Sequence, residues 1–136
     1  LDAIFSGAFR KIVQNNRELH RQHIDQLASQ VVRQIEQSYA DSDLSPTRIA
    51  DSLGMSSAYL GRIFRESMQT SISQYLNQTR IRRAEELLRE TEQPVETVAG
   101  LVGFSNPKYF YVVFKNITGQ TPLQFRKAVH SASEKN

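Results

Sequence analysis

An internal repeat constrains the fold of this chain of 136 residues more than any other feature. Residues 59–65 align with residues 109–115, so that Phe64 pairs with Phe114 at an offset of 50 positions. The same offset continues downstream, where it pairs Gln74 with Gln124 and Tyr75 with Phe125. Self-similarity over tens of residues predicts two copies of one structural unit.

Upstream of these segments the offset is 49, since Ala50 pairs with Ala99 and Gly54 pairs with Gly103. The second copy therefore carries one extra residue in the turn after Gly103, where an insertion is best tolerated. In each copy a small residue precedes a turn glycine by four positions, and a helix with apolar residues at i and i+4 follows. This is the spacing of a helix-turn-helix unit. The apolar anchors are Leu60 and Phe64 in the first copy and Phe110 and Phe114 in the second.

The spacing of the apolar residues predicts an all-α fold, because they recur at helical intervals and strand-like alternation is nearly absent. Several helix starts are marked by a capping residue followed by proline, which needs no N–H at the first helical position. These pairs are Ser45-Pro46, Asn106-Pro107 and Thr121-Pro122, and Pro94 marks another start. We predict seven helices, at residues 20–39, 45–52, 56–67, 71–90, 94–101, 106–117 and 121–129.

The first 18 residues fit this pattern less well. Phe5, Phe9, Ile12 and Val13 share one helical face, which allows an eighth helix, but Asn15-Asn16 interrupts the pattern. We therefore interpret residues 1–18 as a connector. The chain begins with leucine rather than methionine, so we expect a fragment of a longer protein. Residues 131–136 are interpreted as a polar tail.

Composition argues against several other classes of protein. The chain has no cysteine, which removes disulfide scaffolds, thiolate zinc sites and cysteine nucleophiles. His20 and His23 have no convincing third metal ligand, and no nucleophile–base pair or phosphate-binding glycine loop is present. We therefore predict no enzyme, no cofactor and no metal. Seventeen Lys and Arg against fourteen Asp and Glu give a formal net charge of +3, a mild basic bias compatible with a polyanionic partner.

These motifs resemble the DNA-binding domain of the AraC/XylS family of bacterial transcription regulators, over residues 31–127. The resemblance is carried by Ile49-Ala50, Gly54-Met55-Ser56, Tyr59-Leu60 with Phe64-Arg65, Arg80-Ile81 with Ala84 and Leu87-Leu88, Val102-Gly103-Phe104, Tyr109-Phe110 with Phe114-Lys115, and Gly119-Gln120-Thr121-Pro122 with Phe125-Arg126. It implies two homeodomain-like helix-turn-helix subdomains, at residues 19–70 and 91–130, joined by a long linker helix at residues 71–90. Each subdomain would place a recognition helix in the major groove of DNA.

The resemblance also implies the residues that contact bases. In the first copy they are Ser57, Ala58, Gly61 and Arg62, and in the second Pro107, Lys108, Tyr111 and Val112. Arg62 is the strongest candidate, because a guanidinium can donate two hydrogen bonds to guanine. Gly61 departs from the family, since a position that usually reads DNA has no side chain. Phosphate contacts are expected from Ser56, Tyr75, Arg80, Asn106 and Thr121.

Other residues receive structural interpretations. Phe64, Phe114, Tyr59 and Tyr109 are expected to pack in the core, and most charged residues of the linker helix to form a solvated, salt-bridged face. Gln69 stands where the second copy has Gly119, so it must either adopt a left-handed cap or end its helix differently.

We therefore expect the DNA-binding module of a bacterial regulator, with RNA polymerase and an upstream sensor and dimerisation region as partners and no small-molecule ligand. Its expected location is the cytoplasm, beside DNA; a parent protein tethered to a membrane is the alternative. A linker helix of about 30 Å is slightly shorter than the 34 Å repeat of B-DNA, which predicts that the DNA bends toward the protein. The alternative is a helical protein-interaction module that has lost base readout, which Gly61 and Val112 favour. Binding to duplex DNA at low salt distinguishes the two hypotheses.

Overall fold

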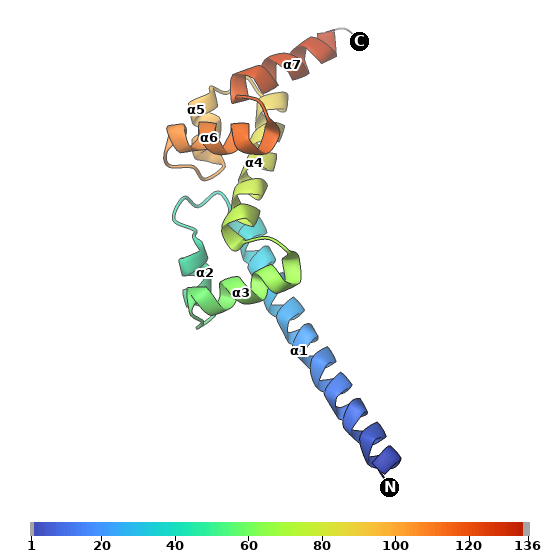
Figure 1. Ribbon diagram of the computed structural model, residues 1–136. Helices are drawn as coiled ribbons and strands as arrows, with labels where there is room; N and C mark the ends of the chain where they lie inside the picture. Colours follow the sequence, from blue (N-terminus) through green and yellow to red (C-terminus); the bar gives the residue numbers. More distant parts are fainter. Residues whose placement is uncertain (1, 135–136) are drawn as a thin grey trace.

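The computed structural model describes the backbone of residues 2–134 and the side chains of residues 10–132. Within that range the chain forms seven α-helices and no strand (Figure 1), which confirms the predicted all-α fold. The helices are α1 (Asp2–Ser38), α2 (Pro46–Ser52), α3 (Ser57–Met68), α4 (Ile72–Glu90), α5 (Val95–Leu101), α6 (Pro107–Thr118) and α7 (Pro122–Glu134). None of the described helices combines the length and the apolar composition that a membrane-spanning segment requires.

Side-chain caps fix where most of these helices begin. Ser45 and Ser56 accept hydrogen bonds from backbone N–H groups three residues ahead, at 3.1 and 3.2 Å. At the start of α7, Thr121 Oγ1 accepts from the N–H of Gln124, whose Oε1 accepts in return from the N–H of Thr121. This reciprocal pair is a capping box. Pro94 differs from the prediction, because it precedes α5 as a cap without a side-chain bond and the helix begins at Val95.

The N-terminal helix differs from the sequence-based interpretation. α1 is continuous through Asn15 and Asn16, so the predicted connector is helical and no separate eighth helix exists in residues 2–38. Asparagine costs only a few tenths of a kcal/mol per helical residue, too little to break a helix with good helix formers on both sides. The side chains of Phe5 and Phe9 lie outside the described residues. The predicted polar tail is also helical as far as Glu134, since α7 continues beyond residue 129.

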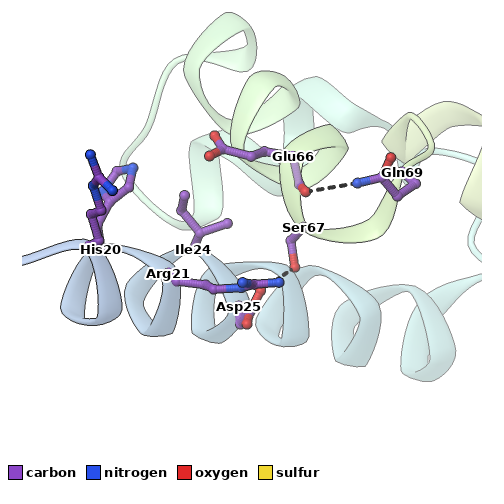
Figure 2. A pocket seen from close by; sticks show the side chains of 8 residues that line it. His20, Arg21, Ile24, Asp25, Glu66, Ser67 and Gln69 are labelled. Carbon is purple, nitrogen blue, oxygen red and sulfur yellow. Dashed lines mark hydrogen bonds between the residues drawn. The ribbon is translucent and has the colours of Figure 1, made fainter. Parts of the chain in front are cut away.

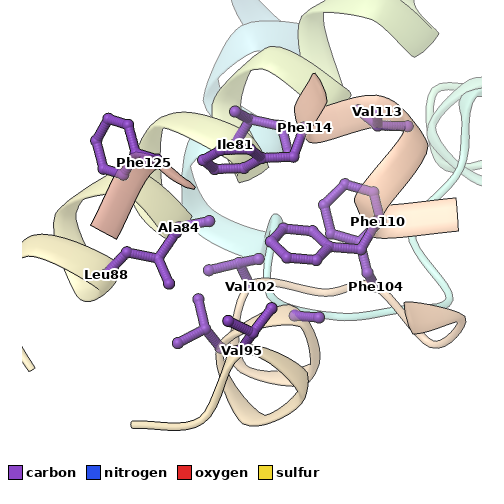
Figure 3. Close-up of a cluster of buried hydrophobic side chains, with 12 residues drawn as sticks. Ile81, Ala84, Leu88, Val95, Val102, Phe104, Phe110, Val113, Phe114 and Phe125 are labelled. Carbon is purple, nitrogen blue, oxygen red and sulfur yellow. The ribbon is translucent and has the colours of Figure 1, made fainter. Parts of the chain in front are cut away.

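Three hydrophobic clusters stabilise the part of the chain that the structure describes, and α4 contributes to the two larger ones; the third joins Ile24 and Leu27 of α1 to Ile63 of α3. The first cluster joins α1, α2, α3 and the start of α4 around Phe64, which is fully buried. The second joins the rest of α4 to α5, α6 and α7 (Figure 3), where Phe114 lies 5.6 Å from Phe110 and 5.7 Å from Phe125 between ring centroids. Residues of the first cluster include Val31, Ile35, Ile49, Leu60 and Leu76.

α4 therefore separates two helix-turn-helix units while packing against both. Its 19 residues correspond to about 28 Å at 1.5 Å per residue. In the view of Figure 1, α2 lies on the same side of α4 as α5 and α6, and α3 and α6 both begin on that side; α6 runs toward α4, and α3 runs past its lower end. The N-terminal half of α1 extends away from both units.

α3 and α6 end in the same way despite different residues. Gln69 follows α3 with φ 61° and ψ 21°, and Gly119 follows α6 with φ 82° and ψ −1°. Both are left-handed, and each N–H donates to the carbonyl four residues earlier. Gln69 thus takes the strained of the two conformations that the sequence left open, at a cost of about 1–2 kcal/mol.

Candidate nucleic-acid interface

One face of α3 is buried and the opposite face is open to solvent. Leu60, Ile63 and Phe64 pack into the core. Of the predicted base-contacting residues, Ser57, Ala58 and Arg62 are exposed and Gly61 is half-buried. No heavy atom lies within 4 Å of the place where a Cβ would stand on Gly61, so the surface around it is open. The first copy therefore presents one long side chain, Arg62, between small residues.

α6 repeats this arrangement with a more apolar surface. Phe110, Val113 and Phe114 are buried, whereas Pro107, Lys108 and Val112 are exposed. Val112 keeps 56% of its surface exposed, so its apolar side chain is open to contact with a partner. Tyr111 is half-buried. Its ring packs edge-on against that of Phe110, with 6.4 Å between the two ring centroids. Tyr111 is thus the least accessible of the four residues expected to contact bases.

The tyrosines that precede the core anchors are not core residues, contrary to the sequence-based interpretation. Tyr59 is 40% exposed and Tyr109 is 50% exposed. Both flank the buried stripe rather than lying within it. The Arg62 guanidinium lies 5.5 Å from the centroid of the Tyr59 ring, and Tyr109 Oη accepts a hydrogen bond of 3.1 Å from Asn77 Nδ2 on α4. The first contact orients the Arg62 side chain on α3, and the second joins the exposed side of α6 to α4.

The residues expected at phosphates fall into two groups. Ser56 and Asn106 are exposed at the starts of α3 and α6, and each caps its helix; Asn106 Oδ1 accepts from the N–H groups of Lys108 and Tyr109. Uncapped N–H groups at a helix start favour an anion. The start of α3 keeps such groups, because Ser56 caps the N–H of Tyr59 alone, whereas at α6 Pro107 has no N–H and Asn106 caps the next two. Tyr75 and Thr121 are half-buried, and the Tyr75 ring packs edge-on against Phe64 at 5.9 Å.

Arg80 does not have the accessible guanidinium that a phosphate contact requires. Its side chain is only 7% exposed. Nε donates to the carbonyl of Tyr39 at 2.8 Å, and Nη2 donates to the carbonyl of Asp41 at 2.9 Å. Burial lowers the pKa of Arg80, opposed by the charge of Asp41, but an arginine remains protonated in any case. We therefore remove Arg80 from the proposed interface.

Other charged residues of α4 form the salt-bridged face that the sequence predicts. Arg82 pairs with Glu36 of α1 at 3.1 Å, and Arg83 pairs with Glu86 at 3.2 Å. The Glu86 carboxylate raises the pKa of Arg83 through this hydrogen bond. Both pairs are partly exposed, so each contributes about 0–1 kcal/mol to stability.

Sequence reasoning missed Tyr59, Tyr109 and Asn77 as residues of the exposed face. The two tyrosines occupy equivalent positions in the repeat, one residue before the apolar anchors. A hydroxyl-bearing ring at the edge of a buried stripe commonly keeps its polar end in water. The exposure of these two tyrosines could therefore have been predicted from the sequence. The hydrogen bond between Asn77 and Tyr109 could not, because it depends on how α6 packs against α4.

A separate hollow of about 430 Å³ lies between α1 and the end of α3 (Figure 2). His20 and Arg21 of α1 and Glu66 of α3 line it. Asp25 accepts a hydrogen bond of 2.7 Å from Ser67, and Gln69 Nε2 donates to the carbonyl of Glu66 at 3.3 Å. Its polar groups therefore partly satisfy one another instead of converging on a ligand. Across the described residues, no three His, Asp or Glu side chains are grouped to hold a metal ion.

Comparison with known proteins identifies the fold. Residues 49–128 match the family model described as a helix-turn-helix domain. The chain is 33% identical over 128 residues to the uncharacterized transcriptional regulatory protein YesN of Bacillus subtilis, covering 92% of this chain and 34% of that protein. It is 32% identical over 117 residues to the arabinose operon regulatory protein of Escherichia coli, covering 86% and 40% respectively.

Two solved structures extend the comparison. The C-terminal domain of AraT, a response regulator from Geobacillus stearothermophilus, superposes with a TM-score of 0.73 at 30% identity, covering 75% of this chain and 84% of that one. The DNA-binding domain of the global transcriptional factor AdpA, solved in complex with a target DNA, gives a TM-score of 0.72 at 25% identity, covering 81% and 97%. The chain spans about a third of the length of the first curated relatives that it matches.

Proposed function

The chain belongs to the AraC/XylS family of helix-turn-helix DNA-binding domains, and on this basis we propose that it binds double-stranded DNA sequence-specifically through α3 and α6 in successive major grooves. The observation that carries the proposal is the matched exposure of α3 and α6, which both begin on the same side of α4. Successive major grooves on one face of B-DNA repeat at about 34 Å. α4, at about 28 Å, is close to that separation.

In this proposal α3 supplies the main hydrogen-bonding contact to a base. The Arg62 guanidinium is exposed on the face opposite Phe64, and the Tyr59 ring beneath it restricts its motion. Such a fork donates two parallel hydrogen bonds to O6 and N7 of guanine. Ser57 and Ala58, in the first turn, are short enough to let α3 approach the bases closely, and Gly61 adds no side chain to fill the groove.

α6 would read DNA differently. Lys108 offers a charge, Val112 and Pro107 offer apolar contact to thymine methyl groups, and Tyr111 offers a hydroxyl with limited reach. Hydrogen-bonding capacity in this copy is low. We propose that the second half-site is distinguished by methyl contacts and by the deformability of the DNA.

The helix starts would position the protein on the backbone of the DNA. Exposed Ser56 and Asn106 stand at the starts of α3 and α6. The uncapped N–H groups at the start of α3 are available to a phosphate, whereas Asn106 would contact one through its own side-chain amide, because Pro107 has no N–H and the next two N–H groups are capped. Thr121 and Tyr75 are secondary candidates, because each is half-buried. Contacts of this kind fix the register of a protein on DNA without specifying its sequence.

The rest of the parent protein also enters as a proposal. Because the first curated relatives are about three times as long as this chain, we propose that an upstream region senses a signal and mediates dimerisation. We further propose RNA polymerase as a protein partner and a cytoplasmic location beside chromosomal DNA. DNA binding accounts for the exposed faces of α3 and α6 without any catalytic step.

Selection of bound duplexes from a random pool tests the proposal, followed by titration of the selected duplex at several salt concentrations. Contacts to about 6–10 phosphates predict a loss of roughly 10³–10⁵-fold in affinity between about 50 and 200 mM salt. Enrichment of a two-part motif supports the proposal. Failure to bind any duplex at low salt would instead favour a protein-interaction module, for which exposed Val112 is the supporting observation.

A further inference from the structure

Arg80 lies in the middle of α4, where the two helix-turn-helix units meet. Two of its hydrogen bonds reach the carbonyls of Tyr39 and Asp41, in the segment that joins α1 to α2 of the first unit. The same guanidinium lies 5.6 Å from the centroid of the Phe104 ring, in the turn that joins α5 to α6 of the second unit. One side chain thus contacts the two units and the helix between them.

The turn of the second unit fits closely against this side chain. Gly103 has φ +105°, a conformation that other residues rarely adopt. A Cβ on Gly103 would stand 2.7 Å from Arg80 Nε and would also collide with the carbonyl oxygen of Tyr39. The Tyr39 carbonyl and the Arg80 guanidinium therefore both lie directly against the Gly103 backbone. Any larger residue at position 103 would push the units apart.

Direct contacts between the helices of the two units are few. Each unit packs mainly within itself and against α4. Tyr39 packs against the edges of both hydrophobic clusters, with the Arg83 guanidinium 5.5 Å from its ring centroid. The Asn77–Tyr109 hydrogen bond anchors α6 to α4 but reaches no helix of the first unit.

The chemistry of Arg80 makes this contact directional. A buried guanidinium must keep its hydrogen bonds, because an unpaired buried charge is strongly destabilising. Its planar fork fits carbonyl acceptors in one orientation, unlike the single point charge of lysine. Two carbonyls of the first unit therefore fix the plane of the fork, and Phe104 of the second unit packs against that plane.

We propose that Arg80 is a positioning residue that sets the orientation of α6 relative to α3 and so determines which spacing of DNA half-sites the protein accepts. This inference rests on the proposed function, since spacing has meaning only if both helices bind DNA. Arg80 acts through the α1–α2 segment and the α5–α6 turn and contacts no base itself. Arg62 and the base-contacting residues of the second copy would then determine the sequence of each half-site, and Arg80 would determine the spacing between the two half-sites.

The test compares Arg80→Lys with Arg126→Lys. Arg126 is a matched control, since its Nε and Nη2 donate to the carbonyls of Leu88 and Thr91 at 3.1 and 3.2 Å, all on the second-unit side of the molecule. The probes are duplexes carrying the two half-sites selected by the wild-type chain, at the selected spacing and with one or two base pairs added or removed. Affinity for each duplex is measured by fluorescence anisotropy.

The quantity compared is the ratio of the affinity for the selected spacing to the affinity for an altered spacing. We expect this ratio to be the same for the wild-type chain and for Arg126→Lys. For Arg80→Lys we expect this affinity ratio to fall about tenfold, which corresponds to about 1.4 kcal/mol in relative binding free energy. Binding to a duplex with a single half-site should stay within about twofold of wild type, since neither recognition helix is altered. A purely structural role would instead lower the affinity for every duplex equally.

A second variant covers the case in which Arg80→Lys fails to fold, as judged by circular dichroism. Gly103→Ala disturbs the same contact from the opposite side, and it should broaden or shift the preferred spacing. An unchanged spacing preference in the folded variants would overturn the inference. Absence of any duplex binding by the wild-type chain would overturn the proposed function instead, so the two failures are distinguishable.

Discussion

At the scale of single residues, Arg62 combines exposure with restricted motion. Its guanidinium lies against the Tyr59 ring on the open face of α3. We expect Arg62→Ala to weaken binding to the selected duplex by about 1–3 kcal/mol and to relax preference at one base pair. The measurement is a competition titration against duplexes substituted at each position.

Arg82→Ala is the control for that variant, because the Arg82 guanidinium already pairs with Glu36 of α1. It should change affinity by much less than Arg62→Ala. If Arg62→Ala weakened binding equally on all sequences, Arg62 would contact a phosphate, and the assignment to a base would be wrong.

The two left-handed caps give a prediction about stability at matched positions. Gln69→Gly should raise the free energy of unfolding by about 1 kcal/mol, because glycine adopts φ 61° without steric cost. Gly119→Ala should lower it by about 1–2 kcal/mol, and nothing within 4 Å of its added Cβ would contribute to that loss. Urea denaturation measures both changes, and changes of the same sign would contradict the backbone explanation.

Single residues also show how far sequence reasoning reached. The left-handed cap at Gln69 was one of two outcomes foreseen, because its repeat partner is Gly119. The burial of Arg80 was not foreseeable, since its acceptors at Tyr39 and Asp41 lie about 40 residues away in the chain. Burial of a charged residue depends on tertiary contacts that helical periodicity does not encode. The family resemblance implied a phosphate contact at Arg80, and the burial of its side chain argues against that contact.

At the scale of helices, capping residues gave most boundaries to within a residue or two. Ser45, Ser56 and Thr121 each cap the helix that follows, as local chemistry predicts. The ends of the chain were harder to predict. α1 continues through Asn15 and Asn16 because a weak local preference against helix is outweighed by cooperative helix propagation on both sides.

The two halves of α1 should differ in stability. From Ile24 onward, α1 buries apolar residues against the first unit, whereas residues 14–23 are all exposed. An isolated helix of this length is marginal in water. We expect amide hydrogen exchange to show protection factors below about 100 for residues 14–22 and far larger values for Val31 and Ile35. Equal protection along α1 would show that another surface covers its N-terminal half.

At the scale of the whole molecule, the length of α4 bears on the shape of the DNA. Its length of about 28 Å falls short of the 34 Å groove repeat, so simultaneous contact predicts bending toward the protein at a cost of about 1–6 kcal/mol. In a native gel, complexes with circularly permuted duplexes of equal length should migrate differently according to the position of the selected site within the duplex. Identical mobility for every permutation would show that the DNA stays straight.

The central claim is that α3 and α6 occupy neighbouring major grooves on one face of the same duplex. Interference by guanine N7 methylation and by uracil in place of thymine, both on the selected duplex, tests it most directly, because guanine N7 and the thymine methyl group lie in the major groove. The account predicts two clusters of interfering bases, centred about 10–10.5 base pairs apart and on one face of the helix. With Arg62→Ala, the cluster at the first half-site should weaken while the other persists. A single cluster, or two clusters on opposite faces of the DNA, would contradict the account.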